Sequence, residues 1–113
     1  MVRCVANRAP TKLADSWDNV GLLAQAPVPR SDGGVFLAID LSPAVADELL
    51  QRGDCSVAVV YHPVIFRPTK SITMADPLQR SILRCIAAGI HLYCPHTTLD
   101  ACPKGINDWL MVG

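Results

Sequence analysis

The chain has 113 residues, of which 50% are hydrophobic and 18% are charged; this composition predicts one globular domain with a single core over residues 1–113, not a disordered or fibrous protein. The 10 basic and 10 acidic residues cancel, and no stretch concentrates Lys and Arg, which argues against nucleic-acid binding. The 5 cysteines lack CxxC spacing and no apolar run reaches the roughly 18 residues of a membrane span, so we expect a soluble cytoplasmic protein with no membrane partner, the nucleus and mitochondrion being the alternatives.

The first third of the chain carries the weaker structural signals. A short helix is predicted at residues 1–9, ended by Pro10. A polar turn at residues 15–19 and a brief apolar piece at residues 20–24 come next. Residues 27–34 contain two prolines and a Ser-Asp-Gly-Gly sequence, which predicts a loop.

Beyond that loop the pattern becomes regular. Continuous apolar runs predict three buried strands, at residues 35–39, 56–61 and 90–94. Ser42 and Asp76 each precede a proline, which is the signature of a helix cap followed by proline at the first helical position. Gly53 and Gly89 are typical helix stop signals, so we expect helices between these pairs of markers. Residues 103–112 begin like a further helix.

The strands and helices alternate, and such alternation predicts an α/β fold with a parallel sheet and right-handed crossovers. Ligands of open parallel sheets bind beyond the carboxyl ends of the strands. The polar residues at those ends are Asp40, Tyr61, His62 and His96. Three separate strands are therefore predicted to deliver polar groups to one edge of the sheet.

His96 and Asp100 are the strongest candidate metal ligands. An imidazole and a carboxylate four positions apart can converge in a helical turn or in a loop, and together they suit Zn, Mn or Fe. His62, held by the following Pro63, adds a third donor. The alternative is that His96 hydrogen-bonds to backbone at a strand end, while Asp100 caps a helix starting near Pro103.

Three protein ligands are enough for a catalytic zinc with an open position, and metal-assisted hydrolysis is the reaction class that follows. A centre of two metals needs more donors; Asp40 or Asp108 could contribute, although each is more typical of a turn or a helix surface. No Gly-x-Ser-x-Gly elbow, P-loop or dinucleotide fingerprint is present, so no catalytic or cofactor-binding residue is assigned beyond the metal ligands.

Other polar groups have a structural and a functional interpretation. Residues 15–23 favour a turn stabilised by Trp17, with the wall of a pocket as the alternative. His91, inside the third strand, is predicted to be a packed or solvent-facing side chain. Cys94 is the cysteine best placed to be a soft metal ligand, because it neighbours His96. Without paired spacing, we expect the cysteines to be small buried hydrophobic residues.

Nearly the whole chain resembles the Nif-three-like family, the NGG-one-interacting-factor-three proteins, also known as GTP cyclohydrolase one type two homologues. The resemblance rests on four segments in family order: LADSWDNVGLL at 13–23, YHPVIFRP at 61–68, PHTTLD at 95–100 and GINDWL at 105–110. It implies a three-layer-like α/β fold with a parallel or mixed sheet and flanking helices, a divalent and dinuclear metal centre, hydrolase-like chemistry of the GTP cyclohydrolase type, and ring-shaped homo-oligomers.

Carried over by position, His62 matches the histidine before proline in the metal motif of the family, and His96 and Asp100 match its H-T-x-x-D ligands. Tyr61 departs from the second histidine of many members and resembles the eukaryotic form. Family members continue for about another hundred residues, which bring a histidine and a glutamate to the metals. The chain thus resembles an N-terminal portion with an incomplete site.

Two functions are carried forward. The first is a metal-binding, hydrolase-like protein that uses His62, His96 and Asp100. The second is a non-catalytic interaction protein, such as a partner of transcriptional regulators, or a truncated fragment with apolar surface covered by self-association. The low charged fraction and the apolar end of the chain motivate the second.

Overall fold

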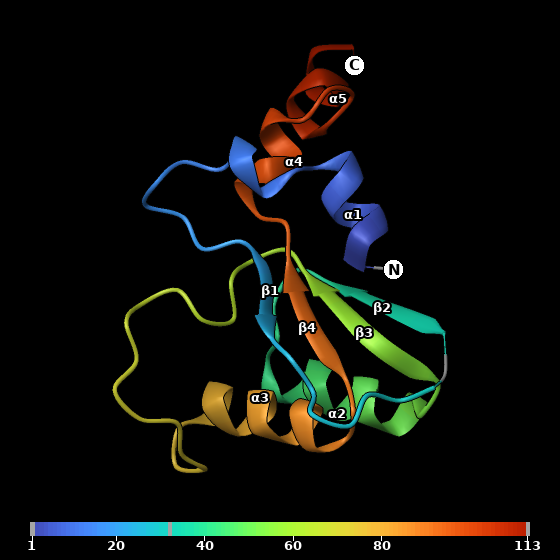
Figure 1. The fold of residues 1–113 in the computed structure, drawn as a ribbon, viewed down its shortest axis with the longest axis vertical. Coiled ribbons are helices and arrows are strands. Elements are labelled where there is room, and N and C mark those ends of the chain that lie inside the picture. Colours follow the sequence, from blue (N-terminus) through green and yellow to red (C-terminus); the bar gives the residue numbers. More distant parts are fainter. Residues whose placement is uncertain (1, 32, 113) are drawn as a thin grey trace.

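Four strands form one mixed sheet, which confirms the predicted α/β fold (Figure 1). The strands are β1 Gly21–Ala24, β2 Gly34–Ala38, β3 Cys55–Val60 and β4 His91–Cys94. Their order across the sheet is β1-β4-β3-β2. β2, β3 and β4 are parallel, as the alternation of elements predicts, and β1 adds an antiparallel edge beside β4. β1 corresponds to the brief apolar piece at residues 20–24. No local signal in the sequence indicated that it would pair with β4.

The structure is a computed structural model that describes residues 2–31 and 33–112. Met1, Asp32 and Gly113, which the predicted helix, loop and domain include, lie outside the described residues. The helices are α1 Val2–Arg8, the 3-10 turn η1 Thr11–Leu13, α2 Pro43–Arg52, α3 Pro77–Ala87, α4 Thr97–Ala101 and α5 Ile106–Val112. Over the described part of the chain, none of them is long and apolar enough to cross a bilayer.

The two crossover helices begin and end at the markers read from the sequence. The side chain of Ser42 accepts a hydrogen bond from the backbone N–H of Val45, and the side chain of Asp76 accepts one from Gln79. Each bond satisfies an N–H group that the first helical turn leaves unpaired. Gly53 follows α2 with a φ of 70°, a left-handed conformation that glycine adopts without steric cost.

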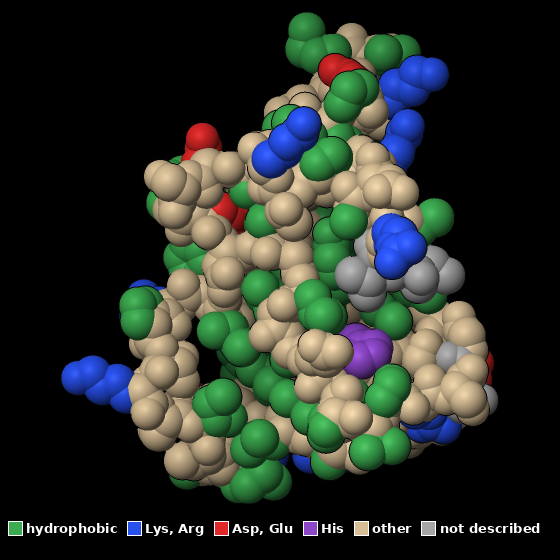
Figure 2. All heavy atoms as spheres, viewed as in Figure 1, with side chains coloured by type: hydrophobic (Ala, Val, Ile, Leu, Met, Phe, Trp, Pro, Cys, Tyr) green, Lys and Arg blue, Asp and Glu red, His purple; other side chains and the backbone are tan. Residues whose placement is uncertain are grey.

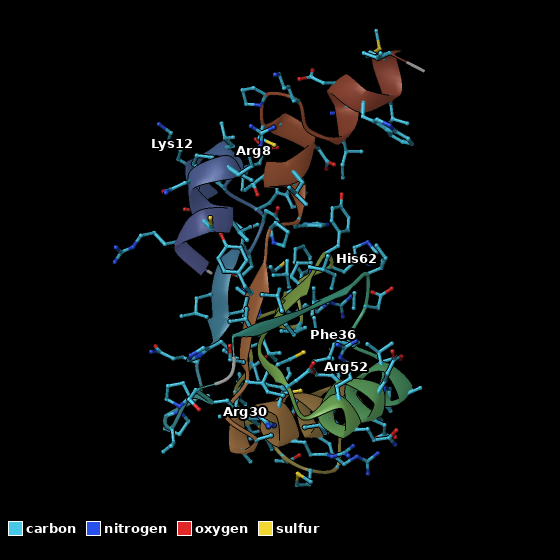
Figure 3. All side chains as sticks on the ribbon, turned by 90° about the vertical axis from the view of Figure 1, so that its right-hand side faces the viewer. Arg8, Lys12, Arg30, Phe36, Arg52 and His62 are labelled. Atoms are coloured by element: carbon cyan, nitrogen blue, oxygen red, sulfur yellow. The ribbon has the colours of Figure 1, made fainter. Side chains whose placement is uncertain are left out.

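The core lies between the sheet and these two helices. α2 and α3 pack against each other and against one face of the sheet, as Figures 1 and 3 show. Leu49 from α2 and Ile82 from α3 are buried against Ala58, Val60 and Leu92 of the central strands. This apolar layer fixes the strands relative to one another, and therefore fixes where their carboxyl ends lie.

The remaining helices lie beyond the end of the sheet toward which β2, β3 and β4 point. Figure 1 shows α1, η1, α4 and α5 gathered there, above the arrowheads of the parallel strands. α4 follows β4 almost directly, so His96 and Asp100 lie at the start of a helix and within it, the first of the two arrangements, helical turn or loop, considered for this pair. α5 lies within the helix predicted at residues 103–112, whereas α4 was not predicted as a separate helix.

We expect the core to depend on Leu49 far more than on the apolar residues at the outer edge. Leu49 is 0% exposed and Leu37 on β2 is 75% exposed. Leu49→Ala should lower the free energy of unfolding by about 2–5 kcal/mol, because it leaves a cavity. Leu37→Ala should change it by less than about 0.5 kcal/mol. Urea unfolding followed by circular dichroism measures both, and equal losses would contradict the placement of the core.

Candidate metal centre

The carboxyl ends of β3 and β4 bring His62 and His96 together. Their ring centroids are 5.8 Å apart, and the Tyr61 ring lies 5.5 Å from His96. The backbone N–H of His62 donates to the carbonyl of Ile39 at 2.9 Å, so the segment after β3 stays paired with the segment after β2. Figure 3 shows His62 at this end of the sheet, with Arg30 and Arg52 at the opposite end.

His96 is held by a buried carboxylate that comes from the N-terminal turn. Its Nδ1 lies 2.7 Å from Oδ1 of Asp18, and the Asp18 side chain is 0% exposed. The hydroxyl of Thr97 donates to the other oxygen of Asp18, and the N–H of Asn19 donates to Oδ1 at 2.8 Å. Burial raises the pKa of Asp18, but hydrogen bonds from Thr97, His96 and Asn19 outweigh it, so the net pKa is lowered.

The backbone of His96 is also unusual. It precedes α4 with a φ of 34°, a positive value that costs a non-glycine residue about 1–3 kcal/mol. Such strain persists only where surrounding contacts impose it, and here the ring contacts Asp18 and Trp17 while the carbonyl of His96 accepts the N–H of Leu99 at 3.1 Å. The imidazole is therefore held from both its backbone and its ring.

His62 also has a carboxylate partner, but this pair is more exposed to solvent. Its Nδ1 lies 2.8 Å from Oδ1 of Asp40, but the two side chains are 48% and 67% exposed. Water competes for an exposed ion pair and weakens it. A carboxylate thus stands at Nδ1 of both histidines, and Nε2 is the ring nitrogen left over in each.

Asp100 lies within α4 and is held by Tyr61. The Tyr61 hydroxyl donates to the two carboxylate oxygens at 3.1 and 3.2 Å. Burial, followed by the hydrogen bond to Asp100, raises the pKa of the Tyr61 phenol, so it keeps its proton and acts as a donor. The alternative in which Asp100 caps a later helix is wrong, because its side chain turns back to the end of β3. Tyr61 contacts the same cluster as a hydrogen-bond donor.

The donor chemistry of this cluster fits a divalent transition metal, since imidazole nitrogen and carboxylate oxygen suit Zn, Mn and Fe. The geometry is incomplete. Within residues 2–31 and 33–112, no three side chains of His, Cys, Asp or Glu come close enough together to hold an ion. The cluster formed by His62, His96 and Asp100 thus offers oriented donors that do not by themselves complete a coordination sphere.

Asp18 is the functional candidate that sequence reasoning missed. Residues 15–19 do form a turn, closed by a bond of 3.0 Å from the N–H of Asp18 to the carbonyl of Asp15. The same turn also reaches the histidines, because the Trp17 ring lies 6.3 Å from that of His96. Nothing local to the turn indicates a partner 78 residues away.

His91 and Asp108 lie apart from this cluster, whereas Cys94 borders it. Nδ1 of His91, at the start of β4, accepts a hydrogen bond from the N–H of Ala26 at 3.1 Å. Asp108 accepts from the N–H of Lys104 at the surface of the C-terminal region. Cys94 is buried and its thiol donates to the carbonyl of Tyr61 at 3.1 Å. Burial raises the pKa of Cys94 to about 12, which disfavours the thiolate that a metal would need.

A family model described as Duf34/NIF3 (NGG1p interacting factor 3) matches residues 1–112. Protein NIF3 homolog of Schizosaccharomyces pombe is 55% identical over 103 residues, which are 90% of this chain and 37% of that protein. A Bacillus cereus protein related to NIF3 superposes with a TM-score of 0.83 at 31% identity, covering 98% of this chain and 30% of its own. Reduced HcgD from Methanocaldococcus jannaschii superposes with a TM-score of 0.86 at 26% identity, covering 98% of this chain and 44% of its own. The chain spans less than half the length of each.

The cysteines give a direct test of burial, and Cys94 reports on this end of the sheet because it ends β4. Cys4 is exposed, whereas Cys55, Cys85, Cys94 and Cys102 are buried and unpaired. Burial raises the pKa of Cys85 to about 11 and that of Cys94 to about 12, so both thiols stay protonated and unreactive at neutral pH. Ellman's reagent should react quickly with Cys4 alone in the native chain, and with all 5 cysteines in denaturant.

Cys4→Ser is the matched control, because it should remove the fast phase without changing the total of the other four. Rapid native reaction of Cys94 would show that the end of β4 opens to solvent.

Proposed function

The chain belongs to the Duf34/NIF3 family, and we propose that it is a metal-binding, hydrolase-like member whose divalent ion is held by His62, His96 and Asp100. The observation that carries this proposal is the pair of strand-end histidines, each with a carboxylate at Nδ1. Metal-binding histidines in proteins commonly have such a partner, which orients the ring and leaves the other nitrogen for the metal.

His62 and His96 would bind through Nε2, and Asp100 through its carboxylate. The hydroxyl of Tyr61 occupies part of the acceptor capacity of that carboxylate, which has about four lone-pair sites, so room for a metal remains. A divalent ion bound there, Zn, Mn or Fe, supplies Lewis-acid polarisation and activates water for hydrolysis. The hydroxyl of Tyr61 fixes the position of the Asp100 carboxylate beside the end of β3.

The proposed site needs donors from beyond the described residues. This part of the chain has no closed group of three ligands, and the relatives above are more than twice as long as the segment that matches. We propose that their additional length, or a second polypeptide, completes the coordination and supports a dinuclear centre. The chain alone should then bind one ion, with an affinity below that of a closed site.

Two features support a planar, GTP-like substrate. Trp17 and Phe66 are 59% and 50% exposed, and their rings meet edge to face at 6.4 Å beside His96. Exposed aromatic faces of this kind offer stacking area for a heteroaromatic ring. A cavity of about 300 Å³ lies beside His62 and Asp40, within reach of the same cluster. Such a substrate would place its ring on the aromatic side chains and its reacting bond near the histidines.

The alternative is a non-catalytic interaction protein that forms homo-oligomers or binds a transcriptional regulator. It is favoured by the apolar surface of α5, where Trp109, Met111 and Val112 are 73%, 87% and 89% exposed. Figure 2 shows hydrophobic side chains at the tip of the molecule formed by this helix. Contiguous exposed apolar side chains are typical of contact surfaces.

Metal analysis tests the first proposal. After incubation with Zn, Mn or Fe and dialysis, we expect the native chain to retain about one ion, measured by inductively coupled plasma mass spectrometry. His96→Ala should lower metal retention by at least about tenfold, since a ligand is lost. His91→Ala is the matched control, because that histidine contacts Ala26 at the other end of β4. If the native chain retains no ion, the proposed metal-binding function is wrong.

Light scattering tests the alternative. If α5 mediates self-association, the native chain should have the mass of a dimer or larger assembly, and Trp109→Ser with Met111→Ser should shift it toward monomer. Val28→Ser is the control, because Val28 is 79% exposed but lies before β2. A native chain that stays monomeric at high concentration counts against this function.

A further inference from the structure

We propose that Asp18 is a positioning residue that holds His96 in the tautomer with the proton on Nδ1, so that Nε2 is kept unprotonated and ready to bind a metal. The tautomer follows from contacts within the chain. Only the use of Nε2 rests on the proposed function.

The direction of the hydrogen bond follows from the other partners of Asp18. Its Oδ1 accepts the backbone N–H of Asn19 at 2.8 Å, a group that can only donate. Its Oδ2 accepts the hydroxyl of Thr97. Both oxygens therefore act as acceptors, and the contact of 2.7 Å with His96 requires the hydrogen to lie on Nδ1. In a neutral ring, Nε2 is then the bare nitrogen.

Burial makes this arrangement firm. The side chain of Asp18 is 0% exposed and that of His96 is 19% exposed. Leaving a buried carboxylate without partners is costly, so its three donors are retained together. The turn that carries Asp18 is also tied to the segment after His62, because the side chain of Asn19 donates to the carbonyl of Ile65 at 2.5 Å. One turn thus supports the segments that follow both β3 and β4.

Asp40 provides an internal comparison. It makes the same contact with Nδ1 of His62, yet both of those side chains are about half exposed or more. Solvent can replace such a contact, whereas no water replaces the buried one. The inference therefore assigns the positioning role to Asp18 and predicts a weaker role for Asp40.

Long-range proton–nitrogen NMR spectra of the labelled, metal-free chain distinguish the tautomers, at a pH where the imidazoles are neutral. We expect His96 to be protonated on Nδ1. His91 is a control in the same spectrum, because its Nδ1 accepts the N–H of Ala26 and its proton must lie on Nε2. A His96 signal with its proton on Nε2 in the native chain overturns the proposal.

The variants separate positioning from a purely structural contact. In Asp18→Asn the neutral amide is a weaker acceptor, so the Nε2-protonated form of His96 should rise, while Asp40→Asn should leave His96 unchanged. A folded Asp18→Asn chain with an unchanged tautomer overturns the proposal. If that variant does not fold, the spectrum of the native chain still decides.

Zinc titration by calorimetry then tests the consequence. Asp18→Asn should weaken zinc binding by about 10- to 100-fold, with a smaller change for Asp40→Asn. Absence of zinc binding to the native chain would reject the proposed function while leaving the tautomer result intact. Native binding with an unchanged affinity in Asp18→Asn would reject the positioning role.

Discussion

The parallel pairing of β2, β3 and β4 is the constraint from which the rest of the site follows. Because these strands point the same way, the residues after them meet at one edge even though they lie far apart along the chain. The apolar layer formed by α2 and α3 on one face keeps the strands in register. His62 and His96 are neighbours for this reason, and no direct bond between them is needed.

A second level of organisation is set by polar side chains. Strand pairing brings the rings near each other, but it does not decide which nitrogen each presents. Buried hydrogen bonds make that decision at His96, where Asp18 and Thr97 close a network away from water. The same logic applies to Asp100 through Tyr61. Tyr61 thus orients a neighbouring carboxylate by donating a hydrogen bond to it.

Two features of the chain are incomplete in the same sense: the apolar surface of α5 is uncovered, and the proposed metal ligands are too few to enclose an ion. The chain matches relatives more than twice the length of the matched segment, its α5 side chains are exposed, and the proposed metal ligands do not form a group of three within the described residues. Additional polypeptide could cover the first and complete the second.

Much of the fold could be predicted because it depends on local signals. Ser42, Asp76 and Gly53 mark helix ends through contacts within a few residues, and continuous apolar runs mark the parallel strands. The prediction that all three of these strands are buried was wrong for β2, because it lies at the edge of the sheet and none of its residues is buried. The strand-end rule then picked out His62 and His96. What the sequence by itself did not reveal are the contacts that span the chain, above all Asp18 with His96 across 78 residues. The local pattern of apolar and capping residues determines the helices and strands. The hydrogen-bond partner of a polar side chain is decided only when packing brings distant segments together and excludes water.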